Sequence, residues 1–195
     1  MAQNKVKYKV IAIGGSAGSL DTILNIIANS FLNNNIFYIV VLHRKSDNDS
    51  LLAGLFSSRT KFKVKEVEDK DSISPGYIYI APPDYHLLVE NENCFSLDSS
   101  EKIYFSRPSI DVTFESVAQV FGDAVIGVLL SGANADGAQG LSIIKQTGGF
   151  TIVQDPKSAE VDFMPRQAIE QLEPDAIVNA AQLPAFLNNL ISPLN

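Results

Sequence analysis

The sequence predicts a single α/β domain, built on a doubly wound, mostly parallel sheet with flanking helices and one inserted β-hairpin. Runs rich in Val, Ile, Tyr and Phe recur along the chain, and segments with helical spacing lie between them. Several runs are apolar at consecutive positions, which is typical of parallel strands buried on both faces. The alternation of strand and helix implies right-handed crossovers, with helices on both faces of the sheet.

The expected elements follow from these runs in chain order. The strand segments are 8–13, 36–42, 62–68, 77–81, 125–130, 150–153 and 176–178. Segments 87–90 and 94–97 flank Asn91-Glu92-Asn93 and predict the hairpin. The helices are expected over 19–31, 49–58, 110–121, 137–147, 165–172 and 183–190. Ser109 is the expected cap of the third helix, with Asp111 in its first turn.

Composition narrows the class of protein. The chain has 195 residues, 46% hydrophobic and 19% charged, which predicts one globular domain over residues 1–195. No apolar run approaches the roughly 20 residues of a membrane helix, and the N-terminus lacks a signal-peptide pattern. A single cysteine, Cys94, fits a reducing compartment, and we expect the cytoplasm.

The net charge of −7 argues against general nucleic-acid binding, which needs a basic face. Basic residues do cluster locally. One cluster, the residues Arg59, Lys61, Lys63 and Lys65, alternates along an expected strand and indicates a solvated face.

The turn GGSAGS after the first expected strand allows three hypotheses: a phosphate loop, an exposed nucleophile, or a simple strand-to-helix connection. A dinucleotide fingerprint would need glycine where Ser16 and Ser19 stand, and a P-loop would need a lysine that is absent here. The segment does match Gly-x-Ser-x-Gly, in which a tight turn exposes a serine hydroxyl. Ser16 is therefore a candidate nucleophile.

A serine nucleophile needs a histidine base and an orienting carboxylate. His43 follows a buried strand at the same expected sheet edge as Ser16, whereas His86 reads better as a hydrogen-bonded loop residue. Asp136 lies in the Gly-rich loop SGANADG after another buried strand, and its rivals are Asp111, Asp155 and Asp162. The chain order Ser, His, Asp differs from that of the α/β-hydrolases.

Several blocks in order resemble the catalytic domain of the chemotaxis protein-glutamate methylesterases, the CheB type. They are IAIGGSAGS, VVLHRK, GYIYIAPPDYHLLVE, RPSIDVTFESVA, IGVLLSGANADGAQGL and TIVQDPKSAEVDFMPRQAI, and they extend from about residue 10 to 178. The resemblance implies a Ser16, His43 and Asp136 triad, the same three residues that the local patterns favour. It implies hydrolysis of glutamyl methyl esters on chemoreceptor helices, with glutamine deamidation as a related reaction.

Further expectations accompany this resemblance. Backbone N–H groups of Ala17 and of the loop around Ala133 would stabilise the oxyanion. Arg44 and Arg107, with Lys45 and Arg59, would form a basic rim for substrate. No cofactor or metal is expected. The expected partners are the cytoplasmic helices of methyl-accepting chemoreceptors, and a separate receiver protein is a candidate regulator in the phosphorelay; no membrane insertion is expected.

The chain departs from the family pattern around each triad position. Ala17 and Ser19 replace the usual Thr and Gly after the serine, and the loop before Asp136 reads Ser-Gly-Ala-Asn-Ala. The length leaves no room for the family's N-terminal receiver domain. The alternative hypothesis is therefore a catalytically weak or inactive module of the same fold that binds receptors; a general small-molecule esterase is a further one.

Overall fold

A computed structural model describes residues 9–33, 35–44 and 49–192 of the chain. Its main sheet has seven strands in the order β3-β4-β2-β1-β7-β8-β9, and every neighbouring pair is parallel. These strands are β1 (Val10–Gly15), β2 (Phe37–Leu42), β3 (Lys63–Glu66), β4 (Tyr77–Ile80), β7 (Val125–Leu129), β8 (Phe150–Gln154) and β9 (Ala176–Val178).

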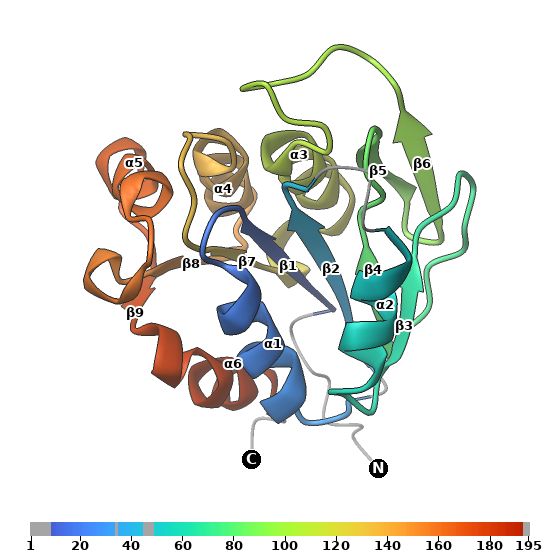
Figure 1. The fold of residues 1–195 in the computed structure, drawn as a ribbon, viewed down its shortest axis with the longest axis horizontal. Coiled ribbons are helices and arrows are strands. Elements are labelled where there is room, and N and C mark those ends of the chain that lie inside the picture. The colour runs from blue at the N-terminus through green and yellow to red at the C-terminus, as the bar shows by residue number, and fades with distance from the viewer. Residues whose placement is uncertain (1–8, 34, 45–48, 193–195) are drawn as a thin grey trace.

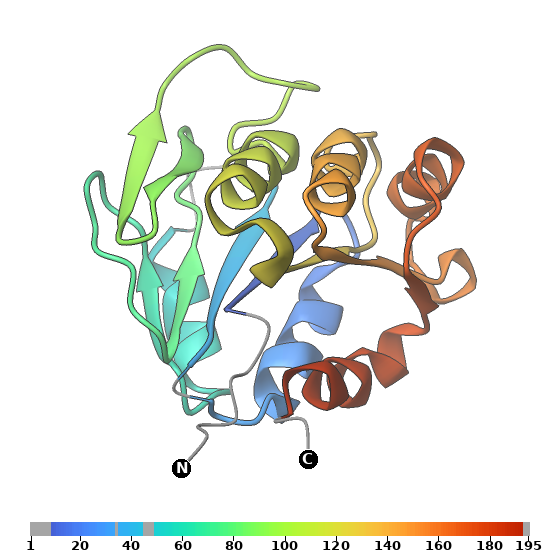
Figure 2. The same cartoon turned by 180° about the vertical axis from the view of Figure 1, so that it is seen from behind.

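Helices cover both faces of this sheet (Figures 1 and 2). On one face lie α3 (Ile110–Phe121), α4 (Ala138–Gln146) and α5 (Phe163–Gln171); on the other lie α1 (Leu20–Asn29), α2 (Asp49–Ser57) and α6 (Leu183–Ile191). The two faces enclose separate hydrophobic clusters. Short 3-10 turns occupy Gly122–Ala124, Pro156–Ser158 and Ala180–Gln182. None of the described helices is long and apolar enough to cross a membrane.

The predicted fold class is confirmed. Every residue of β1, β2 and β7 is buried, as their consecutive apolar positions indicate for central parallel strands. The inserted hairpin pairs β5 (His86–Asn91) with β6 (Cys94–Asp98) as a separate antiparallel sheet. β5 packs against α3, so the hairpin extends the layer of helices on that face. The first residues of the expected 8–13 strand lie partly outside the described residues.

The strand order places the carboxyl ends of β1, β2 and β7 side by side. Gly15 pairs with Leu42 of β2, and Gly14 pairs with Leu129 of β7. β1 is also where the strand order switches direction, because the chain builds outward from it on both sides. Ligands bind at such switch points in open α/β sheets. The segments that follow these three strands therefore define the candidate site.

Candidate active site

Ser16 lies in a turn whose backbone is held on both sides. Its amide donates to the carbonyl of Ser131, 2.9 Å away, which ties the turn to the segment after β7. Its own carbonyl accepts from the amide and the hydroxyl of Ser19, at 3.1 and 2.7 Å. Ser19 is buried, so this departure from the family pattern locks the turn before α1 begins.

The loop after β7 approaches Ser16 closely because Gly132 has no side chain. A Cβ at position 132 would lie 2.4 Å from Cε of Met164 and 3.1 Å from Cβ of Ser16. Ala17 and Ala133 are exposed on either side of this contact. Neither of their amides donates a hydrogen bond within the described part of the chain. Two N–H groups beside Ser16 are thus available to a ligand.

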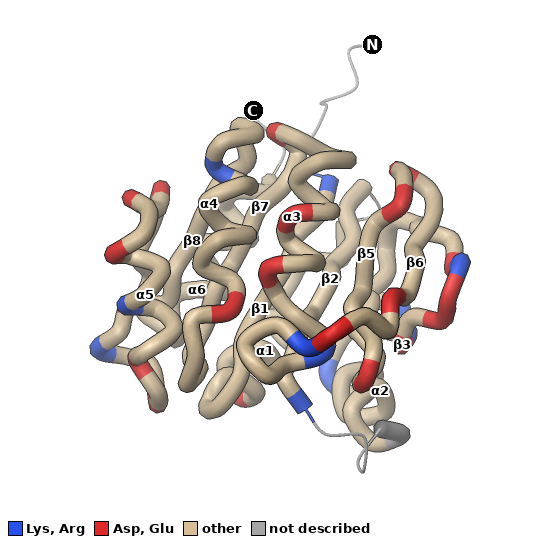
Figure 3. The backbone as a smooth tube through the Cα atoms, turned by 90° about the horizontal axis from the view of Figure 1, so that it is seen from above, with Lys and Arg blue, Asp and Glu red and all other residues tan. Residues whose placement is uncertain are grey.

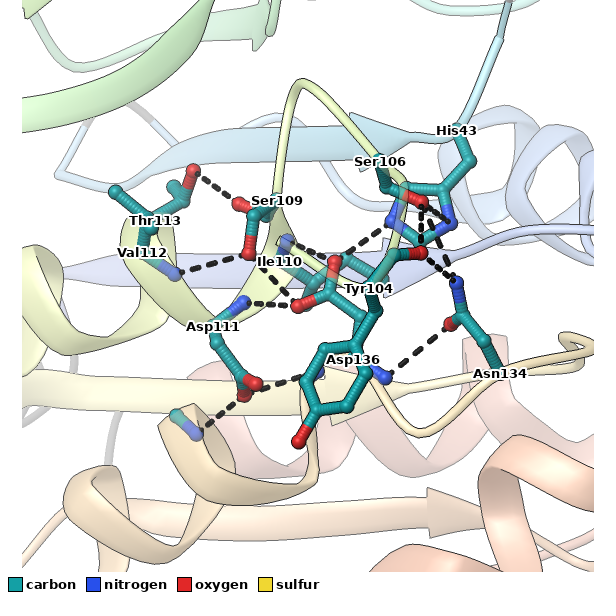
Figure 4. Close-up of polar contacts among 12 residues, drawn as sticks. His43, Tyr104, Ser106, Ser109, Ile110, Asp111, Val112, Thr113, Asn134 and Asp136 are labelled. Atoms are coloured by element: carbon teal, nitrogen blue, oxygen red, sulfur yellow. Dashed lines mark hydrogen bonds and ion pairs between the residues drawn. The ribbon is translucent and has the colours of Figure 1, made fainter. Parts of the chain in front are cut away.

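Asp136 follows β7 and is fully buried, yet its carboxylate has four donors. His43 Nε2 and the Ile110 amide each lie 2.7 Å from Oδ2. The Ser109 hydroxyl and the Asp111 amide contact Oδ1 at 2.7 and 3.0 Å. Figure 4 shows these donors converging on the carboxylate from α3 and from His43. Ser109 also caps α3 by accepting from the Val112 amide, as predicted.

These contacts set the charge of Asp136 and the tautomer of His43. Burial by itself would raise the pKa of Asp136, but the hydrogen bonds from His43, Asp111 and Ile110 outweigh it and hold the pKa below its usual value. An ionised carboxylate can only accept, so Nε2 of His43 carries a proton. In the neutral imidazole, Nδ1 is then the basic nitrogen.

Nδ1 of His43 faces Ser106, whose hydroxyl oxygen is 3.3 Å away. Asn134 Nδ2 donates to the same oxygen, also at 3.3 Å (Figure 4). The Ser16 hydroxyl has no hydrogen-bond partner among the described residues, so the structure brings His43 to Asp136 without joining it to Ser16. Sequence reasoning missed Ser106 and Asn134, since no local pattern marks either of them.

Asp111, the first rival for the carboxylate, serves the loop that carries Asp136. Its Oδ1 accepts from the amides of Gly137 and Gly140, at 2.9 and 2.7 Å. Burial raises the pKa of Asp111 to about 6; the charge of Asp136 acts in the same direction, and the two amides oppose it. α3 and α4 therefore cap each other, because a carboxylate at the start of each accepts N–H groups of the other.

Two further rivals and His86 lie in local hydrogen bonds. Asp155 accepts from the amide of Lys157 at the 3-10 turn after β8, and Asp162 pairs with Arg166 on α5. His86 is buried: its Nε2 donates to the carbonyl of Glu101, and its Nδ1 accepts from the Ser109 amide. His86 is therefore a hydrogen-bonded loop residue, as the sequence indicates.

The geometry can be compared with that of known proteins. A family model of the CheB methylesterase matches residues 11–187.

The chain belongs to the CheB methylesterase family.

Relatives and a solved structure agree with this membership. A Leptospira interrogans relative is 41% identical over 178 residues, which are 91% of this chain and 92% of the relative. A protein-glutamate methylesterase/protein-glutamine glutaminase of Thermotoga maritima is 34% identical over 189 residues, 95% of this chain but 55% of its own length. The crystal structure of the Thermotoga maritima CheB methylesterase catalytic domain matches with a TM-score of 0.89 and 34% identity, over 94% of this chain and 99% of that one.

The arginines expected to form a rim in this family member are engaged within the chain. Arg44, just after β2, pairs with Glu66 of β3, and its side chain is 11% exposed. Arg107 donates from Nη1 to the carbonyls of Ser99 and Ser100, both at 2.7 Å. In Figure 3 the segment between β6 and α3 carries acidic positions next to basic ones. Lys45 lies outside the described residues.

Proposed function

We propose that this chain hydrolyses methyl esters of glutamate residues in chemoreceptors, with Ser16 as nucleophile, His43 as base and Asp136 as the carboxylate that orients His43. The observation that carries the proposal is the 2.7 Å contact between His43 and the buried, ionised Asp136, at the strand end next to Ser16. Membership of the CheB methylesterase family supplies the reaction class.

The proposed reaction begins when Ser16 turns its hydroxyl toward Nδ1 of His43. Catalytic hydrogen bonds are often longer or absent in ligand-free structures and form in the substrate complex. His43 takes the hydroxyl proton as Ser16 Oγ bonds to the ester carbonyl carbon, and then gives that proton to the departing methoxide. Methanol leaves an acyl-enzyme on Ser16. His43 next activates water, which releases glutamate and regenerates the hydroxyl.

Asp136 and the unpaired amides have separate parts in this scheme. Asp136 stabilises the imidazolium that forms on His43 and holds its ring in place. The amides of Ala17 and Ala133 would donate to the oxyanion, whose negative charge develops only as Ser16 attacks. Both amides are exposed and unpaired within the described residues, which supports this assignment.

The same acyl-enzyme would form from a glutamine side chain, with ammonia as the leaving group. Relatives are named for both activities, so we include deamidation in the proposal. The proposed partners are cytoplasmic chemoreceptor helices and a separate receiver protein, acting in the cytoplasm on one catalytic domain over residues 1–195. No cofactor or metal enters the scheme.

Methanol release from a methylated chemoreceptor tests the proposal directly. We expect Ser16→Ala to lower kcat/KM by at least about a thousand-fold, because the nucleophile is lost. Ser106→Ala is the matched control, since Ser106 is the other serine beside His43. A serine-directed fluorophosphonate should label the wild type and Ser106→Ala but not Ser16→Ala. Equal methanol release by Ser16→Ala and the wild type would refute the assignment.

The alternative, an inactive receptor-binding module, predicts a different result. The wild type would then bind methylated receptor but neither release methanol nor react with the fluorophosphonate. Labelling lost only in Ser106→Ala would instead make Ser106 the nucleophile, a result allowed by its 3.3 Å contact with His43.

The basic rim stays part of the proposal for substrate binding. Arg44 and Arg107 reach the carboxyl edge of the sheet, although each has partners within the chain. If Arg44 attracts an acidic receptor segment, Arg44→Glu should raise KM most at low salt. An unchanged salt dependence of KM would remove Arg44 from the rim.

A further inference from the structure

The segment between β6 and α3, residues 99–108, forms a long arm at the edge of the molecule (Figures 1 and 2). Near its end, Ile103 and Ser106 exchange two backbone hydrogen bonds of 3.1 and 2.8 Å. Tyr104 and Phe105 are the two residues between them, and their φ angles are +47° and +61°. Two positive φ angles in a two-residue loop are the pattern of a type I′ turn.

The residues at the tip do not suit this turn. Type I′ turns favour Asn-Gly or Asp-Gly, because side chains with a Cβ are strained at positive φ. Phe105 is 99% exposed and Tyr104 is 48% exposed, so burial does not compensate for the strain or explain the aromatic residues. Strained backbone that persists in a folded protein is commonly associated with function.

The tip is also held against the candidate active site. Ser106, next to Phe105, contacts Nδ1 of His43, and Asn134 donates to both the Tyr104 carbonyl and the Ser106 hydroxyl, at 3.3 Å each (Figure 4). The base of the arm is anchored by Arg107 on the Ser99 and Ser100 carbonyls and by His86 on the Glu101 carbonyl. The two aromatic side chains therefore have a defined position relative to His43.

We propose that Tyr104 and Phe105 form a docking tip that contacts the protein segment carrying the glutamyl ester and so favours protein substrates over small esters. The inference rests on the proposed function. An apolar contact suits this chain, because its net charge of −7 opposes association with a segment rich in glutamate. Exposed aromatic residues are also frequent anchors of protein recognition.

The test is the double variant Tyr104→Asn with Phe105→Gly. Asn-Gly is the preferred type I′ sequence, so the turn, Ser106 and its contact with His43 should be retained while both rings are removed. Two substrates are compared: a purified methylated chemoreceptor cytoplasmic fragment and a small N-acetylglutamate γ-methyl ester. Phe31→Ser is the matched control, because Phe31 is 67% exposed just after the end of α1, at the opposite edge of the sheet.

We expect the double variant to raise KM for the receptor fragment about ten-fold, with kcat nearly unchanged and a melting temperature equal to or above that of the wild type. The small ester should be hydrolysed at the wild-type rate, and Phe31→Ser should match the wild type on both substrates. Phe105→Leu should restore most of the loss relative to Phe105→Gly, since it keeps an apolar side chain.

The outcomes separate this inference from the proposed function. A wild type that hydrolyses neither substrate refutes the proposed function. A wild type that hydrolyses the receptor fragment with a KM equal to that of the double variant refutes the docking tip alone. An equal loss on both substrates, or a wild-type dimer that the double variant converts to monomer, also overturns it, by showing a positioning or self-association role instead.

Discussion

At the scale of single residues, Asp136 is the most constrained group at the site. Each of its two oxygens accepts one backbone amide, from Ile110 on one side and Asp111 on the other. Backbone N–H groups cannot turn away, so both oxygens must be acceptors. The position therefore requires a carboxylate for folding as well as for holding His43.

Asp136→Asn should consequently damage both activity and stability. Whichever way the amide is oriented, its NH₂ group faces a backbone N–H. We expect kcat/KM to fall by about a thousand-fold or more and the free energy of unfolding to fall by about 1–3 kcal/mol. Ester hydrolysis and urea denaturation measure the two effects.

Asp155→Asn is the control for that substitution. Oδ1 of Asp155 accepts the amide of Lys157, so an asparagine oxygen can replace it while its NH₂ group points elsewhere. Its stability and activity should stay close to those of the wild type. An Asp136→Asn protein as stable as Asp155→Asn would contradict the account of the buried carboxylate.

At the scale of elements, the site depends on how α3 and α4 begin. Gly137 precedes α4 with φ +99°, and a Cβ there would lie 2.5 Å from Leu129 Cδ1 and 2.8 Å from Ile110 Cγ2. Gly140 lets α4 approach α3, since its Cβ would lie 2.9 Å from the Asp111 carbonyl oxygen. Glycine at these positions allows the reciprocal capping by Asp111 and Asp136.

Gly137→Ala should therefore destabilise the protein by at least about 2 kcal/mol, because it combines backbone strain with overpacking. Gly54→Ala is the matched control, since Gly54 lies inside α2 and a Cβ there meets nothing within 4 Å. That change should stabilise the protein by up to about 1 kcal/mol. Thermal or urea denaturation of both variants checks the pair; equal effects would show that the start of α4 tolerates a side chain.

At the scale of the whole molecule, the raised pKa of Asp111 makes folding stability depend on pH. The unfolded carboxyl group ionises near its ordinary value of 3.8, whereas the folded one ionises near 6. Between these values the folded state binds more protons. Its contribution to stability is thus complete below pH 3.8 and is lost as the pH rises through 6.

Urea denaturation at pH 5 and pH 7.5 tests this. The wild type should lose on the order of 1 kcal/mol from Asp111 between the two values. Asp111→Asn should lose that pH dependence and keep its fold, because one amide oxygen can accept both the Gly137 and Gly140 amides. The depressed pKa of Asp136 acts at lower pH and does not enter this window. The same pH dependence in both proteins would rule out Asp111 as the group responsible.

The sequence by itself determined the fold class, the strand and helix segments, and the placement of Ser16, His43 and Asp136 at one sheet edge. Consecutive apolar residues and tight turns are local signals, and parallel strands bring their carboxyl ends to the same side whatever the loops do.

Only the tertiary structure decided which side chains meet at that edge. Ser106 lies 63 residues from His43 in the chain, and Ser109 lies 27 from Asp136. Such contacts depend on how α3, α4 and the arm pack together, and no local periodicity encodes that. The same holds for Asp111, which the sequence presents as an ordinary acid in the first turn of a helix and the fold turns into the cap of its neighbour.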